Sequence, residues 1–227
     1  MDSVTLQTLR DTFSSCKFHL GSGQSEFTPI ACVFYDNSAT EFSGGNYWGV
    51  PAIAADQAIL DEQGNEVPQG QQGEICWRGP QAMSRYLNNE QASDEASQFG
   101  WHHSGDLGLI DSQGQLLFVD RKKDMIKSGG ENVASIKVEQ ALLELPHIVQ
   151  VAAFGLPHPQ WSEAVCAAVK ITPDSEFNEQ EILQHCKTLL AGYEVPKRIL
   201  LVEEFPLTAT GKVQKNELRE KYSQLFQ

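Results

Sequence analysis

Lys212 closes the stretch Pro-Leu-Thr-Ala-Thr-Gly-Lys, which has neither a helical nor a strand period. Gly211 gives the backbone freedom to turn, so two hydroxyl groups and an ammonium group are expected to gather on an exposed loop. A single lysine on such a loop is most often a solvated charge. Other motifs in the chain therefore have to decide whether Lys212 has a function.

Three further stretches combine glycines with carboxylate, hydroxyl or cationic side chains, namely Gly21–Glu26 (GSGQSE), Gly100–Gly108 (GWHHSGDLG) and Val119–Val133 (VDRKKDMIKSGGENV). Within the second stretch, His102 and His103 are adjacent and could suggest a metal site. Neighbouring residues of a strand point to opposite faces, so we do not expect these two rings to bind one ion. The glycines of the third stretch do not form a P-loop, because no Gly-Lys-Ser/Thr follows them.

Taken in order with Pro206–Lys212, these stretches resemble the adenylate-forming acyl-CoA synthetases and their relatives, the luciferases and the peptide-synthetase adenylation domains. The resemblance spans roughly residues 5 to 222. In that family a carboxylate attacks the α-phosphorus of ATP, and a thiol, usually that of coenzyme A, then displaces AMP. The resemblance implies an ATP-dependent acid–thiol ligase that uses ATP, Mg²⁺ and CoA. We expect its carboxylic acid substrate to be a fatty acid.

The resemblance also implies roles for single residues. Lys212 would bridge the carboxylate and the α-phosphate, as a flexible and compact cation. Ser25 would contact phosphate, and Glu26 would hold Mg²⁺, a hard ion that prefers oxygen ligands. Asp106 would accept hydrogen bonds from both ribose hydroxyls, and Arg121 would add a contact to the ribose.

A second group of residues is implied in the thioester step. Lys123 falls where the family has its hinge, a residue whose dihedral change swings the small domain between two poses. Lys127, Ser128, Gly129 and Gly130 would line the path of the CoA thiol, since glycine lets the backbone pass close to a ligand.

The net charge and the composition of the chain agree with a globular protein of this kind. Seventeen basic and thirty acidic residues give a net charge of −13, which argues against nucleic acid as the main partner. No apolar run approaches the roughly 20 residues of a membrane span. The cysteines are scattered and form no Cys-x-x-Cys pair, so we expect reduced thiols and a cytoplasmic protein. They are Cys16, Cys32, Cys76, Cys166 and Cys186.

The strands and helices that the sequence predicts around these residues indicate an α+β fold in two parts. Residues 1–122 contain strand-like runs separated by glycine turns, which predicts a strand-rich, barrel-like end of a larger AMP-binding domain. Residues 123–227 predict a compact α+β C-terminal domain. Its expected elements are a helix from Ser135, a strand in which Val165, Ala167 and Val169 alternate with other residues, a helix capped by Asn178 with an apolar face of Ile182, Cys186, Leu189 and Leu190, and a last helix near Lys215.

Full-length members of the family carry several hundred residues ahead of the region matched by Gly21–Glu26, including a phosphate loop. We therefore expect this chain to be a fragment that is inactive alone, with a separate N-terminal half as one arrangement. Two other functions stay open. One is an adenylation domain that loads a carrier protein, and the other is a stand-alone nucleotide-binding, CoA-binding or regulatory module.

Overall fold

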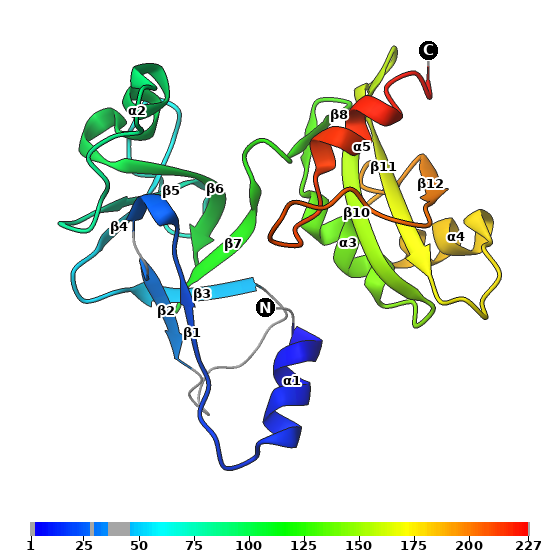
Figure 1. Cartoon of the computed structure of the whole chain (residues 1–227), viewed down its shortest axis with the longest axis horizontal. Coiled ribbons are helices and arrows are strands. Elements are labelled where there is room, and N and C mark those ends of the chain that lie inside the picture. The colour runs from blue at the N-terminus through cyan, green and yellow to red at the C-terminus, as the bar shows by residue number, and fades with distance from the viewer. Residues whose placement is uncertain (1–2, 28–29, 36–45, 227) are drawn as a thin grey trace. The chain divides into compact units, whose positions relative to one another are not determined.

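The computed structural model describes residues 3–27, 30–35 and 46–226. The chain divides into two compact units, Met1–Lys122 and Lys123–Gln227 (Figure 1). Each unit is described by itself. In the described part of the chain, no helix is both long enough and apolar enough to cross a membrane.

The first unit is built mainly from antiparallel strands. Among its described residues, seven strands form one sheet in the order β1-β2-β3-β7-β6-β5-β4. The elements are α1 (Ser3–Thr12), β1 (His19–Ser22), the 3₁₀ turn η1 (Ser25–Phe27), β2 (Cys32–Tyr35), β3 (Asn46–Pro51), β4 (Asp56–Leu60), β5 (Gly73–Arg78), α2 (Glu90–Ala96), η2 (Gln98–Gly100), β6 (His102–Ile110) and β7 (Leu116–Arg121).

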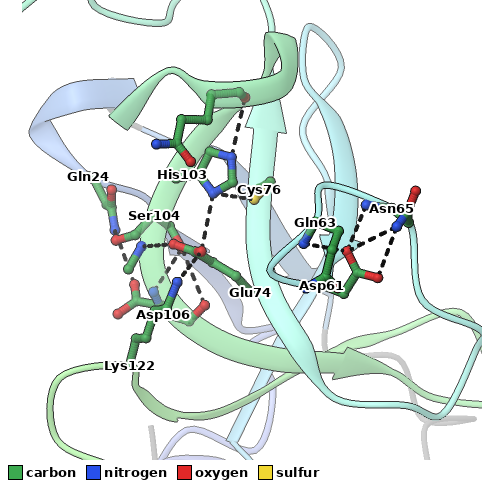
Figure 2. Close-up of polar contacts among 12 residues, drawn as sticks. Gln24, Asp61, Gln63, Asn65, Glu74, Cys76, His103, Ser104, Asp106 and Lys122 are labelled. Carbon is green, nitrogen blue, oxygen red and sulfur yellow. Dashed lines mark hydrogen bonds and ion pairs between the residues drawn. The ribbon is translucent and has the colours of Figure 1, made fainter. Parts of the chain in front are cut away.

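Two of the turns in this unit use the same aspartate chemistry. Asp61, which follows β4, accepts hydrogen bonds at Oδ1 from the backbone amides of Gln63 at 2.9 Å and Asn65 at 2.8 Å (Figure 2). These bonds lower the pKa of the Asp61 carboxyl, and the bond from the Asn65 amide has the largest effect. Asp111 holds the β6–β7 connection through two equivalent amides. Such turns satisfy their own polar groups and fix where the next strand begins.

The core of the first unit holds the turn η1 in place. Phe27, the last residue of η1, is fully buried. Its ring lies 5.8 Å from that of Trp77 on β5 and 6.0 Å from that of His102 on β6. Burial of a phenylalanine side chain is worth about 1.5–3 kcal/mol, so this contact anchors the turn to the sheet. The polar residues just before Phe27 are thereby fixed beside β6.

The second unit is a sheet covered by helices on both faces. Among its described residues five strands pair, with the path β10-β11-β8-β9 and with β12 parallel to β11. The elements are β8 (Ile126–Ser128), β9 (Glu131–Val133), α3 (Ser135–Leu143), β10 (Ile148–His158), β11 (Ser162–Ile171), α4 (Glu179–Leu189), β12 (Arg198–Leu201) and α5 (Lys215–Lys221).

Strand β11 buries apolar side chains on both faces of the sheet, so helices have to pack on both faces. Val165, Ala167 and Val169 pack in the cluster with α3 and α4, whereas Cys166 and Ala168 pack in the cluster with α5. Figure 1 shows α3 and α4 apart from α5 around the sheet. The predicted alternation along β11 is confirmed, and both of its sets of side chains are buried. The predicted α+β fold class is confirmed as well.

Helix α4 begins as predicted and ends differently. The side chain of Asn178 accepts hydrogen bonds from the amides of Gln180 at 3.1 Å and Glu181 at 3.3 Å, so the predicted cap is confirmed. The expected position of Leu189 on the apolar face is wrong, because its side chain is 43% exposed. The helix ends there, and Leu190 turns into an extended conformation and is buried in its place.

Candidate active site

A hydrogen bond between side chains brings two of the distant motifs together in the first unit. Gln24, which precedes η1, donates from Nε2 to Oδ2 of Asp106 at 3.1 Å and to the carbonyl oxygen of Ser104 at 2.7 Å. Its Oε1 lies 3.2 Å from Nε2 of His102. The Gly21–Glu26 turn is therefore fastened to three residues of β6, and Figure 2 shows Gln24 beside two of them, Ser104 and Asp106.

Asp106 is a buried carboxylate with cationic and neutral partners. It is 6% exposed and lies opposite Arg121 in the β6–β7 ladder, with Arg121 Nε 3.7 Å from its Oδ1. Burial raises the pKa of the Asp106 carboxyl, and Arg121 and Gln24 oppose that shift only in part. A carboxylate has about four acceptor positions, so these two partners leave room for hydroxyl donors.

Glu26 is positioned by a second stretch of the chain. Its Oε1 accepts a hydrogen bond of 2.9 Å from the hydroxyl of Tyr86, and its carbonyl oxygen accepts one of 2.7 Å from the amide of Met83. Burial, followed by the bond to Glu26, raises the pKa of the Tyr86 hydroxyl, which therefore stays a donor. The side chain of Ser25, one residue earlier, is exposed.

Glu74 on β5 holds the start of β6 and the side chain of Lys122 in place. Only 9% of the residue is exposed, and Oε1 accepts from the amide of Gly105 at 3.0 Å. Its Oε2 lies 3.1 Å from Nδ1 of His103 and 3.0 Å from Nζ of Lys122 (Figure 2). Cys76 lies 3.5 Å from the same His103 nitrogen, but burial raises its pKa to about 12. This cysteine is therefore a thiol and not a nucleophile at neutral pH.

In the second unit, Lys212 stands at the end of a closed and rigid turn. The amide of Thr208 donates to the Lys212 carbonyl oxygen at 2.8 Å, and the Lys212 amide donates to Thr208 Oγ1 at 3.1 Å. An antiparallel bridge between Leu207 and Val213 closes the base. Gly211 has φ +80°, which explains the glycine. The Lys212 side chain is exposed.

The helix after this turn is fixed by a buried ion pair. Nζ of Lys215, the first residue of α5, lies 2.7 Å from Oε1 of Glu139 and donates to Oγ of Ser135 at 2.6 Å. Both side chains of the pair are less than one fifth exposed, and the same Glu139 oxygen accepts from the amide of Ala153. This network joins α5 to α3 and β10, three residues after Lys212.

Gly129 and Gly130 form the two-residue turn of the β8–β9 hairpin. Their φ values are +62° and +90°, the conformation in which such hairpin turns favour glycine. The amide of Gly129 donates to the carbonyl oxygen of Trp161 at 2.9 Å. A Cβ atom added at Gly130 would meet nothing within 4 Å. Lys127 is exposed, whereas Ser128 is 3% exposed and points into the unit.

Comparison with known proteins assigns the chain. The family model described as AMP-binding enzyme matches residues 1–87, and the model described as AMP-binding enzyme C-terminal domain matches residues 137–212. The chain belongs to the AMP-binding enzyme family. The motifs that suggested it lie in both units.

The relatives that the chain matches include CoA ligases. The chain is 45% identical over 148 residues to the peroxisomal trans-cinnamate:CoA ligase of Petunia hybrida, covering 65% of the chain and 26% of the relative. It is 37% identical over 201 residues to a long-chain-fatty-acid–CoA ligase of Escherichia coli, covering 88% of the chain and 35% of the relative. The chain spans between about a quarter and two fifths of the length of the curated relatives it matches.

Solved structures of adenylate-forming enzymes share the fold. ATP-bound MatB from Rhodopseudomonas palustris superimposes with a TM-score of 0.87 at 26% identity, covering 97% of this chain and 44% of that chain. The o-succinylbenzoate CoA synthetase of Bacillus subtilis, solved with its acyl-adenylate intermediate, gives 0.86 at 27% identity, with 94% and 43% covered.

The fold brings some of the predicted site residues together within the first unit. Asp106 and Arg121 are cross-strand partners, and Ser25 and Glu26 directly follow Gln24, which touches Asp106. The second unit carries Lys212 and the Gly129–Gly130 turn on separate supports, α5 and the β8–β9 hairpin.

Sequence reasoning missed two residues of this site, Gln24 and Glu74. Gln24 occupies the variable position of its turn, and nothing in its residue type marked it. Glu74 follows a glycine in a stretch that reads as an ordinary strand, although a carboxylate next to a run of buried strand residues is itself a signal.

Proposed function

We propose that the protein containing this chain is an AMP-forming acid–CoA ligase. A carboxylate oxygen of the acid bonds to the α-phosphorus of ATP, and the bond from that phosphorus to the pyrophosphate oxygen breaks. The thiol sulfur of CoA then bonds to the acyl carbon, the bond to AMP breaks, and the thiol proton leaves to solvent. The Gln24–Asp106 hydrogen bond carries the proposal, because it joins the two motifs that the first step needs.

In the first half-reaction, Asp106 binds both ribose hydroxyls with its remaining acceptor positions. Arg121 sits beside it, 47% exposed, and adds a donor toward the ribose. Ser25 has an exposed hydroxyl at the turn next to Gln24 and contacts phosphate. Support comes from the burial of Asp106 and from the partners that hold its carboxylate in one orientation.

Glu26 is the residue that would hold Mg²⁺. Among the described residues, no three His, Cys, Asp or Glu side chains gather into a metal cage. Magnesium is commonly held by one or two carboxylates together with substrate phosphates and water, and a single half-buried glutamate fits that pattern. When bound, the ion would supply charge neutralisation at the phosphates.

Lys212 brings its ammonium group to the reacting carboxylate and the α-phosphate. Positioned cations lower the barrier where charge develops, provided that they need no reorganisation during the reaction. The hydrogen-bonded Thr208–Lys212 turn supports this role, because it fixes the backbone from which the side chain extends. The long flexible side chain can then enter and leave with the unit that carries it.

The second half-reaction uses the β8–β9 hairpin. Gly129 and Gly130 present backbone without side chains, and open space surrounds the second of them, so a thiol can pass close by. Lys127 is exposed on the same hairpin, and the side chain of Ser128 is buried beneath the hairpin. Lys123, the first residue of the second unit, is the hinge that exchanges the two poses.

The acid that we propose is a fatty acid, because several matched relatives are named long-chain-fatty-acid–CoA ligases. Cinnamate and ferulate, the acids in the names of other relatives, are the competing substrates in the test. We propose the cytoplasm as the location, since the described cysteines are free thiols and four of them are buried.

A chimera tests the function. The matched 35% of the Escherichia coli long-chain ligase is replaced by this chain, and palmitate-dependent exchange of labelled pyrophosphate into ATP is measured. We expect exchange and palmitoyl-CoA formation from the chimera, and loss of exchange when Asp106 is changed to Ala. A chimera that exchanges normally with Asp106→Ala would contradict the assigned site.

Two further experiments test the fragment proposal and the carrier-loading alternative. The 227-residue chain alone should give no acid-dependent exchange with palmitate, cinnamate or ferulate, because it spans so little of its relatives. Robust exchange by the chain alone would overturn the fragment proposal. Supplying a phosphopantetheinylated carrier protein in place of CoA tests the carrier-loading alternative, and we expect no acyl transfer to it.

A further inference from the structure

The chain passes from one unit to the other within a single residue step, between Lys122 and Lys123. Lys122 is tied to the first unit twice. Its amide donates to the carbonyl oxygen of Gly105 at 2.9 Å, and its ammonium group lies 3.0 Å from Oε2 of Glu74. The last residue of the first unit is thus fixed through both backbone and side chain.

Glu74 is suited to this anchoring because it cannot move independently. Its side chain is 11% exposed and also accepts from the Gly105 amide and contacts His103. The carbonyl group of Gly105 receives Lys122, while the amide group of Gly105 binds Glu74. Lys122, Glu74 and Gly105 therefore form a closed ring of contacts, of which Figure 2 labels Lys122 and Glu74.

Asp124 is tied to the second unit from the other direction. It is 8% exposed, and its Oδ1 accepts from Nη2 of Arg219 on α5 at 2.9 Å. Helix α5 is itself held by the buried Lys215–Glu139 pair. Between these two anchors lies Lys123, which is exposed and, among the described residues, donates no main-chain hydrogen bond.

We propose that Glu74 and Arg219 are positioning residues that confine the pivot between the two units to Lys123. The inference rests on the hinge role of Lys123 in the proposed function and assigns it a mechanism. One residue contributes two soft dihedral angles, φ and ψ. Releasing Lys122 or Asp124 would add two more on either side, and the relative orientations of the units would multiply.

Hydrogen exchange of the 227-residue chain measures the first anchor directly. The Lys122 amide should be protected in the wild type and should exchange about two- to fivefold faster in Lys122→Met, the effect of losing a partly exposed ion pair. Glu74→Gln is a second variant with the same expected direction. Arg85→Met, which removes an exposed cation of the same unit, should leave that amide unchanged.

Distances between the units measure both anchors. Spin labels are attached at Gln72→Cys and Gln180→Cys, two exposed positions in different units, with the exposed Cys16 changed to Ser. Pulsed electron resonance should give a broader distance distribution for Lys122→Met and for Arg219→Met than for the parent. The double variant should be broader still, because the anchors lie in different units.

Thermal unfolding and a second control separate anchoring from general destabilisation. Lys221→Met removes an exposed cation from the same helix as Arg219 and should leave the distribution unchanged. An unchanged distribution in the Lys122→Met/Arg219→Met double variant, with unfolding near that of the parent, would overturn the proposal. Neither measurement uses ATP or an acid, so failure of the ligase function in the chimera would be seen separately.

Discussion

Replacing Lys212 by Ala should separate the two half-reactions. The side chain is exposed, and the turn that carries it is closed by backbone and Thr208 hydroxyl contacts, none of which involves the ammonium group. Substitutions at such surface positions usually change the free energy of unfolding by less than about 0.5 kcal/mol. A loss of rate in this variant therefore reports the missing cation and not a lost fold.

The expected loss follows from the role of the cation. Removing one preorganised group that stabilises developing charge costs about 2.7–4 kcal/mol, which is a factor of about 10² to 10³ in rate. The turn fixes the backbone from which the cation extends, because the amide of Thr208 is 2.8 Å from the Lys212 carbonyl oxygen and that of Gly211 is 2.9 Å from the Thr208 carbonyl oxygen. Thioester formation from preformed acyl-adenylate needs no such cation and should fall by less than about threefold.

The assay uses the chimera that carries this chain. Pyrophosphate exchange reports adenylate formation, and release of AMP from synthetic palmitoyl-adenylate and CoA reports the second step. Lys187→Ala, an exposed lysine of α4, serves as the matched control and should behave as the parent in both assays. Equal losses in the two half-reactions for Lys212→Ala would refute the assignment of this cation to the first step.

Three other changes have defined outcomes. Lys215→Met removes the ammonium partner of the largely buried Glu139 carboxylate and should lower the free energy of unfolding of the second unit by about 3 kcal/mol in urea denaturation, whereas the exposed Lys221→Met should change it by less than about 0.5 kcal/mol. The Glu74 carboxyl has a lowered pKa, because its bonds to a lysine and a histidine outweigh the opposing effect of burial. Its contribution to stability is therefore present above the ordinary glutamate pKa of about 4.3 and is lost as the pH falls through the lowered folded-state value, so Glu74→Gln should be less stable than the parent at pH 7 but should converge with it below about pH 4 in pH-dependent thermal melts. Gly130→Leu should block the thioester step and spare pyrophosphate exchange, whereas Gly114→Leu, which also places a side chain at positive φ in open space, should spare both.

The elements of the second unit could be predicted because local and tertiary signals agree there. The helix from Ser135 and the cap at Asn178 begin where the sequence indicates, since both depend on residues next to one another in the chain. The helical period places Leu189 on the apolar face, but Leu189 is the last residue of α4 and is exposed. The end of that helix is set by how Leu190 packs in the core, which periodicity does not contain.

Some residues of the candidate site could likewise be predicted from the sequence, and others could not. Motif residues such as Asp106 could be named from the sequence, because their types and order are characteristic of a family. Gln24 and Glu74 could not, because each acts on a segment far along the chain: Gln24 on Asp106, 82 residues away, and Glu74 on Lys122, 48 residues away. Their roles exist only in the folded sheet, where β5, β6 and β7 become neighbours. A functional survey of this chain should therefore begin with the partners of Asp106 and Lys122.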